Sequence, residues 1–400
     1  MSLIDTALTE VERHLDEDEV VGLARDMIRI PSIFGNEARI AEFIASRLES
    51  WGFSPRFVEV PGFGPDVVVD YGDPGLPKVV LSGHMDTVEV MSGWVHDPFR
   101  ASIEDGFMYG LGSLDMKSGL AAMMVALKAI SESGLQDRLH VSFQAVSGEE
   151  KDGDGTRTLI RAGEFEGARA IIVGEGFGGL NVVTAGRRGG SYYEIEVRGK
   201  SAHGAIPHKG INAVVEASKV VLALDSMEMV RADGVLADDL APLKESQTVL
   251  LMHGGTGSLT VPDRCTMKVV RSTVPGGKTD ISDDIRSVIA GLGLQGSAEV
   301  TFKSGPKDLY LPHMTSSDSP LVRAVVSSVR QYTGSSPTVV CGVSEADDNL
   351  IAQETRVPVI CVGPGESGNL ARYHQAEEAI SIGQLGTAAK VFARTVLDLS

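Results

Sequence analysis

The run Leu81-Ser82-Gly83-His84-Met85-Asp86-Thr87 continues an apolar strand that begins at Val79. Alternation along an extended strand end points His84 and Asp86 to the same side, so the carboxylate can orient an imidazole that binds a metal. Such a pair alone is weak evidence for a metal site. The rest of the chain has to supply further ligands.

Further candidate ligands follow in order along the chain. Asp115 lies in Gly112-Ser113-Leu114-Asp115-Met116-Lys117, and the pair Glu149-Glu150 follows an apolar run at 141–146. Glu175 lies in Val173-Gly174-Glu175-Gly176, and His374 comes late in the chain. Two histidines and several carboxylates, with no cysteine in position, form the nitrogen and oxygen ligand set that zinc accepts, with cobalt or manganese as substitutes.

Two metal ions explain this ligand set better than one. A single zinc ion needs only three protein ligands, whereas five ligands with one shared carboxylate match two ions roughly 3.5 Å apart. Asp115 is the natural bridge, because it opens a helix expected at 117–133 and because Gly112 and Gly119 let the backbone pass close to the ions. The sequence therefore predicts a hydrolase with two divalent metal ions.

The adjacent acids Glu149 and Glu150 have to play different roles, since their side chains point in different directions at a strand end. One can bind a metal ion while the other stays free as the general base for the attacking water. An acidic run of this kind is more often a solvated turn. Here it follows an apolar strand and takes its place in the ligand series, which favours a site.

Composition and length limit the class of protein. The 400 residues are too many for one ordinary core, so we expect two domains. No apolar run approaches a membrane span, and the N-terminus lacks a signal-peptide pattern. The net charge of −18 argues against nucleic-acid binding, because phosphate contacts need positive side chains. The scattered cysteines form no C-x-x-C pair and favour a reducing cytoplasm; they are Cys265, Cys341 and Cys361.

Strands and helices alternate in the first part of the chain and again near its end. This alternation predicts an α/β fold with helices on both faces of its sheet. The candidate ligands fall just after strand ends, where ligands collect in open α/β sheets. The expected helices lie within 1–30 and at 36–50, 117–133, 155–162 and 320–332, and the expected strands lie at 56–60, 67–71, 78–82, 138–147, 168–173, 337–340 and 357–362.

The pattern changes after Arg187-Arg188-Gly189-Gly190. From there the expected order is β-α-β-β-α-β, that of a ferredoxin-like α+β unit, which an acidic surface excursion at 226–246 interrupts. We therefore predict a domain at 187–304 inserted into a catalytic domain that is formed by 1–186 and 305–400. Its expected strands lie at 191–197, 248–253, 265–274 and 298–303, and its expected helices lie at 211–224 and 280–292.

The inserted domain also predicts how two chains assemble. Its four antiparallel strands leave an exposed sheet edge, and pairing that edge or the helices with a second copy would hide it. We therefore expect a homodimer formed through about 187–304.

The motifs together resemble the zinc-dependent aminoacylase and carboxypeptidase family over most of the chain. Its members include acetylornithine deacetylase, succinyl-diaminopimelate desuccinylase, the glutamate carboxypeptidases and several dipeptidases. The resemblance implies a catalytic domain with a mixed sheet and an inserted lid and dimerisation domain. The motifs that carry it are Gly83-His84-Met85-Asp86-Thr87-Val88, Trp94 with Asp97-Pro98-Phe99, Tyr109-Gly110-Leu111-Gly112, Asp115-Met116-Lys117-Ser118-Gly119, Ser147-Gly148-Glu149-Glu150, Gly199-Lys200-Ser201-Ala202-His203-Gly204, and His374 with Glu377.

The same resemblance implies a metal ligand for each position of the series. His84, Asp115 and Glu175 would hold one zinc ion. The second ion would bind Glu150 and His374 and share Asp115 with the first. The resemblance further implies a cis peptide bond after Asp115.

Roles for the remaining site residues also come from the resemblance. Asp86 would support His84, and Glu149 would be the general base. His203 would reach across a dimer interface, when the lid closes, to stabilise the oxyanion in the partner's site. Arg187 and Arg271 match basic positions that bind the substrate carboxylate in some relatives.

The leading interpretation is a metal-dependent amidohydrolase that cleaves an N-acyl amino acid or small peptide with a free carboxylate. A metallo-dipeptidase or carboxypeptidase is the alternative to a deacylase. A metallo-phosphoesterase is disfavoured because the loops near Asp115 and Glu149 are mostly acidic. A metal-binding protein without catalysis is disfavoured because Glu149 is present. Two departures leave the substrate open: Leu111 replaces a frequent arginine, and Leu259-Thr260-Val261-Pro262 lacks a frequent asparagine.

Overall fold

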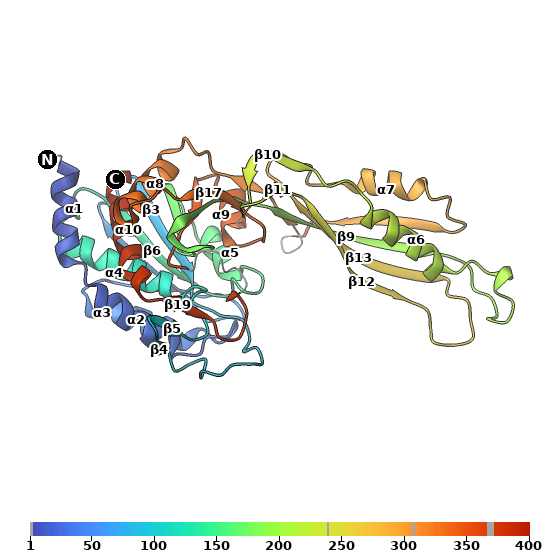
Figure 1. Ribbon diagram of the computed structural model, residues 1–400, viewed down its shortest axis with the longest axis horizontal. Helices are drawn as coiled ribbons and strands as arrows, with labels where there is room; N and C mark the ends of the chain where they lie inside the picture. The colour runs from blue at the N-terminus through green and yellow to red at the C-terminus, as the bar shows by residue number, and fades with distance from the viewer. Residues whose placement is uncertain (1–2, 238–239, 306–308, 366–371) are drawn as a thin grey trace.

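The computed structural model describes residues 3–237, 240–305, 309–365 and 372–400. Figure 1 shows two parts of unequal size, of which the larger contains both marked ends of the chain. The smaller part extends away from it along the long axis of the molecule and contains helices α6 (Ala213–Asp225) and α7 (Ser282–Ala290). The two parts meet near the start of strand β9 (Gly189–Arg198).

A mixed sheet forms the centre of the larger part. Its described strands follow the order β1-β2-β6-β3-β7-β18-β8-β16, and β17 also pairs with β8. β3 pairs in parallel with β6 and β7, whereas β1, β2 and β16 pair antiparallel with their neighbours. The bounds are β1 (Arg56–Val58), β2 (Asp66–Gly72), β3 (Lys78–His84), β6 (His140–Val146), β7 (Ala168–Val173), β8 (Val182–Arg187), β16 (His313–Met314), β17 (Thr338–Gly342) and β18 (Val359–Cys361).

Helices cover both faces of this sheet, as predicted. On one face α4 packs against β3 and β6 and contacts α1, α2 and α10. Elsewhere α9 contacts β8, β18 and α5. No helix of the described residues is both long and apolar enough to cross a membrane. The bounds are α1 (Leu3–His14), α2 (Glu17–Ile28), α3 (Ala38–Ser50), α4 (Lys117–Glu132), α5 (Asp154–Arg161), α8 (Pro320–Thr333), α9 (Asp347–Thr355) and α10 (Gly383–Leu399).

The smaller part has the predicted β-α-β-β-α-β order. Its antiparallel sheet follows the order β12-β13-β9-β14, and α6 and α7 pack together against it over an apolar core of its own. A short strand, β15, pairs with β9 as a fifth member that the sequence did not predict. The further bounds are β12 (Ser246–Gly254), β13 (Arg264–Thr273), β14 (Ser297–Lys303) and β15 (Leu309–Tyr310).

The region 226–246 is more than a surface excursion. Strands β10 (Arg231–Leu236) and β11 (Pro242–Lys244) form a hairpin in it. Leu243 is buried with Val274 of the smaller part and Cys341 of β17. The hairpin thus packs against both parts through its few apolar side chains. The acidic composition of the segment gave no indication of this apolar contact.

Other elements were not predicted from the sequence. Helix α10 has apolar residues at helical spacing, most of which are buried, so the sequence does contain a helical pattern there. A separate sheet with the order β19-β5-β4 consists of strands of three residues, which are too short for a period of two to be visible. Their bounds are β4 (Ser102–Glu104), β5 (Phe107–Tyr109) and β19 (Ala379–Ser381).

Candidate metal centre

Three neighbouring parallel strands deliver most of the candidate ligands to one edge of the large sheet. His84 is the last residue of β3, and the pair Glu149-Glu150 and Glu175 follow the ends of β6 and β7. β3 lies between β6 and β7 and runs parallel to both. Because parallel strands end at the same edge, side chains that are far apart in the sequence meet there.

Asp115 lies directly before α4 in a loop that a buried carboxylate holds. Glu378 accepts hydrogen bonds from the backbone N–H groups of Gly112, Leu114 and Asp115, at 3.0, 2.7 and 3.0 Å. Burial raises the pKa of Glu378 to about 8, against the effect of the Gly112 hydrogen bond. The peptide bond between Asp115 and Met116 is cis, as expected.

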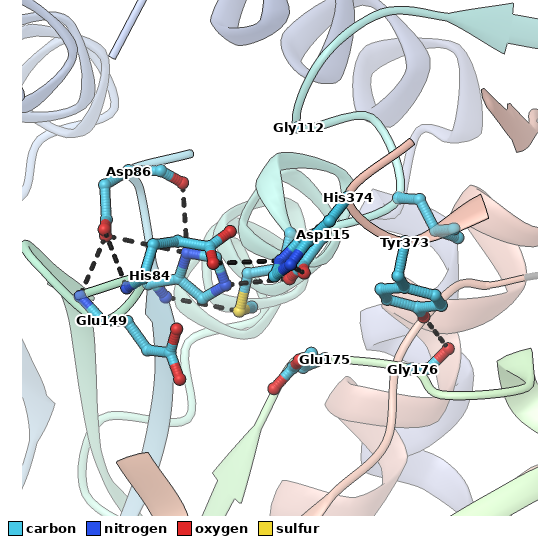
Figure 2. A network of polar contacts seen from close by, with 12 residues as sticks. His84, Asp86, Gly112, Asp115, Glu149, Glu175, Gly176, Tyr373 and His374 are labelled. Atoms are coloured by element: carbon cyan, nitrogen blue, oxygen red, sulfur yellow. Dashed lines mark hydrogen bonds and ion pairs between the residues drawn. The ribbon is translucent and has the colours of Figure 1, made fainter. Parts of the chain in front are cut away.

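His374 reaches the site from the last part of the chain because its neighbour Tyr373 is hydrogen-bonded to the loop after β7. The Tyr373 hydroxyl donates a hydrogen bond of 2.7 Å to the carbonyl of Gly176. Its ring stacks on Phe177 with 4.8 Å between the centroids. Figure 2 shows the hydrogen bond from Tyr373 to Gly176, with His374 beside Asp115.

The candidate ligands form two groups that share one residue. His84, Asp115 and Glu175 offer ligand atoms that lie within 4.8 Å of one another, and so do Asp115, Glu150 and His374. His84 Nε2 lies 2.9 Å from Asp115 Oδ1, whereas His374 Nε2 lies 3.4 Å from Asp115 Oδ2 and 3.0 Å from Glu150 Oε2. Asp115 therefore presents a different oxygen to each histidine, as a bridging ligand must.

The electrostatics of the two groups also fit divalent cations. Burial raises the pKa of Glu175 to about 8, because the protein alone compensates its charge poorly. Burial acts on Asp115 in the same direction, but hydrogen bonds from His374 and His84 outweigh it and hold the pKa of this carboxyl well below its usual range. Bound cations would supply the positive charge that such a cluster of buried carboxylates needs.

Asp86 contacts the site differently from the expectation. The group closest to His84 Nδ1 is the backbone carbonyl of Asp86, at 3.1 Å, while the nearer carboxylate oxygen lies 3.7 Å away. The carboxylate instead accepts hydrogen bonds from the backbone N–H groups of Glu149 and Glu150, at 3.3 and 3.1 Å. Asp86 thus fixes the ring of His84 through its backbone and positions the acidic pair through its side chain.

Glu149 lines a cavity of about 430 Å³ together with the ligands Asp115, Glu150, Glu175 and His374, but it belongs to neither ligand group. Burial raises the pKa of its carboxyl well above the usual range, and the charges of Asp347 and Glu150 add to this effect while that of His84 opposes it. In Figure 2 its carboxylate lies to the same side of the His84–Asp115 pair as Glu175. A free carboxylate with a raised pKa beside a metal site is suited to accept a proton.

Arg187 lines the same cavity, and buried carboxylates compensate its charge. Its side chain is fully buried and forms ion pairs with Asp348 and with Glu175, the latter at 3.1 Å. A third bond joins its Nη1 to the Ser344 hydroxyl at 3.0 Å, and the guanidinium lies 4.7 Å from the Phe177 ring centroid. These contacts orient Glu175, whereas the expected binding of a substrate carboxylate by Arg187 stays a prediction.

Two further predicted residues lie in the smaller part, outside the cavity lining. Arg271 is buried on β13, where it forms an ion pair with Glu245. His203 is exposed five residues after the end of β9 at Arg198, and its backbone pairs with Thr260. At about 3.3 Å per residue, a strand of ten residues separates its ends by roughly 30 Å. His203 therefore lies far from the ligand groups of its own chain, and both roles stay predictions.

Comparisons with known proteins identify the family. The model of peptidase family M20/M25/M40 matches residues 80–398, which include every candidate ligand. The chain belongs to this family. As an M20 protein it is a hydrolase that acts on amide bonds, and its two ligand groups are the residues available for metal binding.

Relatives and solved structures agree with this membership. The chain is 25% identical to a probable succinyl-diaminopimelate desuccinylase of Staphylococcus epidermidis over 92% of its length and 94% of that protein. The aminopeptidase PepT of Bacillus cereus has the same fold, with a TM-score of 0.78 and 20% identity over 96% of this chain and 99% of that one. A dinuclear metal binding peptidase of the M20 family from Bacillus subtilis matches with a TM-score of 0.72 and 16% identity, over 96% and 98% of the two chains.

The structure adds residues that sequence reasoning missed. Glu378 holds the Asp115 loop, Asp348 compensates Arg187, and Tyr373 anchors His374. Glu378 directly follows Glu377 of the quoted motif, and Asp348 lies in the acidic pair that opens α9, so both were visible as acids. Their roles depend on contacts across more than a hundred residues, which spacing along the chain does not reveal.

Proposed function

We propose that this M20 hydrolase uses two divalent metal ions to cleave the amide bond of an N-acyl amino acid or small peptide with a free carboxylate. The observation that carries the proposal is the shared ligand Asp115, whose two oxygens face His84 and His374 separately. A group of three ligands on each side of one carboxylate has the composition of a two-metal hydrolytic site.

The proposed division of the ligands between the two ions is the one that the family resemblance implies. His84, Asp115 and Glu175 would hold one ion, and Asp115, Glu150 and His374 would hold the other. Zinc suits this nitrogen and oxygen set, with cobalt or manganese as substitutes. When bound, the ions would lower the pKa of a water molecule and polarise the amide carbonyl.

Glu149 is proposed as the general base. Its carboxylate would take a proton from the attacking water and deliver it to the nitrogen of the leaving amine. Asp86 fixes the position of Glu149 through the backbone hydrogen bond of 3.3 Å. Its neighbour Glu150 lies 3.0 Å from His374, so the two adjacent acids have separate tasks.

We further propose a homodimer in which His203 completes the site of the partner subunit. The position of His203 beyond the far end of β9 supports this role, since the histidine lies far from its own ligand groups. Apolar side chains that suit an interface lie exposed on α6 and β12, among them Leu222, Leu250 and Leu251 at 71%, 55% and 52% exposure. The exposed edge of β12 would be hidden in such a dimer.

A dipeptidase or carboxypeptidase activity is the second candidate. The names of the similar proteins include a desuccinylase and an aminopeptidase, which both hydrolyse amide bonds but differ in the group beside the bond.

A cytoplasmic location also belongs to the proposal. Its support is that Cys265, Cys341 and Cys361 are all free and buried.

The test is hydrolysis of a substrate panel with and without metal. N-acetyl and N-succinyl amino acids and dipeptides are incubated with the protein as purified, after chelation, and after zinc, cobalt or manganese is restored. We expect cleavage that chelation abolishes and metal restores, with products identified by mass spectrometry. Cleavage that survives complete chelation, or no cleavage of any amide with metal bound, would contradict the proposal.

A further inference from the structure

The motif formed by Trp94 and Asp97-Pro98-Phe99 lies in a loop outside the two ligand groups. Between its two parts the loop carries His96. This loop contacts the segment of the candidate ligand His374, because backbone N–H groups of the loop donate hydrogen bonds to the side chain of Glu377. His96 and Glu377 are 281 positions apart in the sequence, so only the folded chain brings them together.

His374 is by far the most exposed of the five candidate ligands. Its side chain is 49% exposed, whereas those of the other four are 2% to 8% exposed. Its backbone has a φ of 56°, in the left-handed region that a residue other than glycine rarely adopts. Such a conformation persists only where the surrounding structure fixes it. The hydrogen bond of Tyr373 fixes it on the N-terminal side, and we therefore expect a further contact on the C-terminal side.

Glu377 supplies this contact from three residues further along the chain. Its Oε1 accepts hydrogen bonds from the backbone N–H groups of Val95 and His96, at 2.6 and 3.0 Å. Its Oε2 lies 2.5 Å from His96 Nδ1. Glu377 itself has a positive φ of 63°. Both oxygens of one carboxylate thus bind the same loop and fix the turn that follows His374.

The ring of His96 is held by further neighbours. It stacks on the Tyr109 ring, with 4.2 Å between the centroids and 16° between the planes. Its Nε2 lies 3.4 Å from Oε1 of Glu104. The hydrogen bond to Glu377 raises the pKa of His96, and the one to Glu104 adds to this effect while burial opposes it. A protonated His96 donates from both ring nitrogens, one to each carboxylate.

The loop of His96 has a firm base in the fold. The carbonyl of Pro98 accepts a hydrogen bond of 2.9 Å from the N–H group of Leu111. The neighbouring Gly110 donates one of 3.0 Å to the carbonyl of Glu378, and β19, which follows at once, pairs with β5. The loop and the turn after His374 are therefore attached to the same short strand, so His96 can hold Glu377 in a constant position.

The adjacent acids Glu377 and Glu378 bind different parts of the fold. Glu378 is buried and accepts hydrogen bonds from the Asp115 loop, whereas the side chain of Glu377 is 31% exposed and binds the His96 loop. The simpler interpretation is that His96 and Glu377 only stabilise the fold. It explains little, because solvent screens a partly exposed ion pair and leaves it a small effect on stability.

We propose that His96 and Glu377 are positioning residues that hold His374 in place for the metal ion bound by Asp115, Glu150 and His374. A shift of His374 would weaken this ion, since metal–ligand distances tolerate only small changes. The other ion is bound without His374 and would keep its affinity. This inference rests on the proposed two-metal site and adds two residues that determine the affinity of one ion.

Titration of the metal-free protein with Co²⁺, against a competing chelator, measures the two binding steps separately. His374→Ala identifies the step that depends on this histidine. His96→Phe keeps a ring against Tyr109 but removes the donor, so we expect the His374 step to weaken about tenfold and the other step to change less than about twofold. Glu377→Ala should weaken the same step at least as much, because it removes all three contacts.

A conservative variant separates the donor from the shape of the ring. His96→Asn places an amide N–H group near the position of Nδ1, so it should recover most of the affinity that His96→Phe loses. His14→Phe is the matched control. His14 is also a partly exposed histidine beside two carboxylates, 3.4 Å from Glu10 and 3.6 Å from Glu132, and it lies on α1 outside the cavity lining. This variant should leave both binding steps unchanged.

The outcomes separate failure of this inference from failure of the proposed two-metal site. Selective weakening of the His374 step that His96→Asn restores would support the inference, whether or not an amide is cleaved. A His374 step that His96→Phe and Glu377→Ala leave unchanged would overturn it. Equal weakening of both steps together with a lower denaturant midpoint would show a structural role only and would also overturn it. If His374→Ala removes no step, the two-metal site itself is contradicted.

Discussion

The large sheet buries three of its candidate ligands, whereas the smaller part carries its candidate catalytic histidine on an exposed loop; the ligand His374 is itself 49% exposed. His84, Asp115 and Glu175 are 3%, 6% and 5% exposed, and each is fixed by contacts within the chain. Among the residues that the structure describes, the one hydrogen bond of the His203 ring is local: Nδ1 accepts from the backbone N–H of Ala205. The ligand groups are therefore complete in one chain, while the position of His203 at a site has to come from assembly.

The two regions also have separate apolar cores. The large sheet and its helices share one extensive core, while the β12-β13-β9-β14 sheet and its two helices have a separate one. The hairpin around Leu243 makes a small apolar contact between them. Separate cores support the predicted domain boundaries at 187 and 304, which stay predictions, and they suit a lid that moves relative to a rigid metal centre.

The largest effect should come from the shared ligand. Asp115→Ala removes a carboxylate that faces both histidines, so the protein should lose bound metal and more activity than the ~10⁴-fold upper range for a general base. Elemental analysis of the purified variant measures the metal. Asp137→Ala, in an exposed loop after α4, is the control. Two ions still bound to Asp115→Ala would exclude this residue as the bridge.

The second effect separates the base from the ligands within the same buried region. Glu149→Gln keeps the shape of the side chain but cannot accept a proton, so activity should fall by ~10²–10⁴-fold with the metal content unchanged. Glu150→Gln, its neighbour 3.0 Å from His374, should instead weaken metal binding. Kinetics and elemental analysis of both variants check this. Near-normal turnover by Glu149→Gln would refute its role as the base.

The third effect tests whether the exposed histidine acts across subunits. His203→Ala should reduce activity by ~10²–10³-fold, the cost of an oxyanion donor, without loss of metal. After subunit exchange between His203→Ala and Glu149→Gln, one intact site per heterodimer should recover activity. His208→Ala, an exposed histidine of the same loop, should leave the homodimer active. Confirmed exchange without recovery would place His203 in its own subunit's site or outside catalysis.

The smallest effect concerns stability rather than turnover. Burial raises the pKa of Asp66 to about 8 from a usual value of 3.8, so the folded protein keeps a proton that the unfolded chain releases. The free energy of unfolding should therefore fall as pH rises from about 4 to about 8. Asp66→Asn cannot release a proton, so it should remove the contribution of Asp66 to this fall, which is on the order of a few kcal/mol. Denaturant unfolding across this range measures it. Asp70→Asn, on the exposed side of β2, is the control; equal slopes in all three proteins would contradict the prediction.

The sequence by itself determined the α/β class, the ferredoxin-like order of the second region and the ligand series. It could do so because these features are local. Apolar runs define strands, and candidate ligands such as His84, Glu150 and Glu175 come directly after strands whose parallel order brings their ends together. The family motifs added the division of the ligands between two ions and the cis peptide bond, which spacing alone would not have supplied.

Only the tertiary structure decided what holds and surrounds these residues. Glu378 supports Asp115 from more than 260 positions away, and Arg187 is neutralised by Asp348 from the distant start of α9. The same end of α9 places Asp347 in the lining of the cavity that contains the ligands. Such contacts depend on how the strands and helices pack, and a sequence pattern carries no information about which distant charge will lie against a given side chain once both are removed from water.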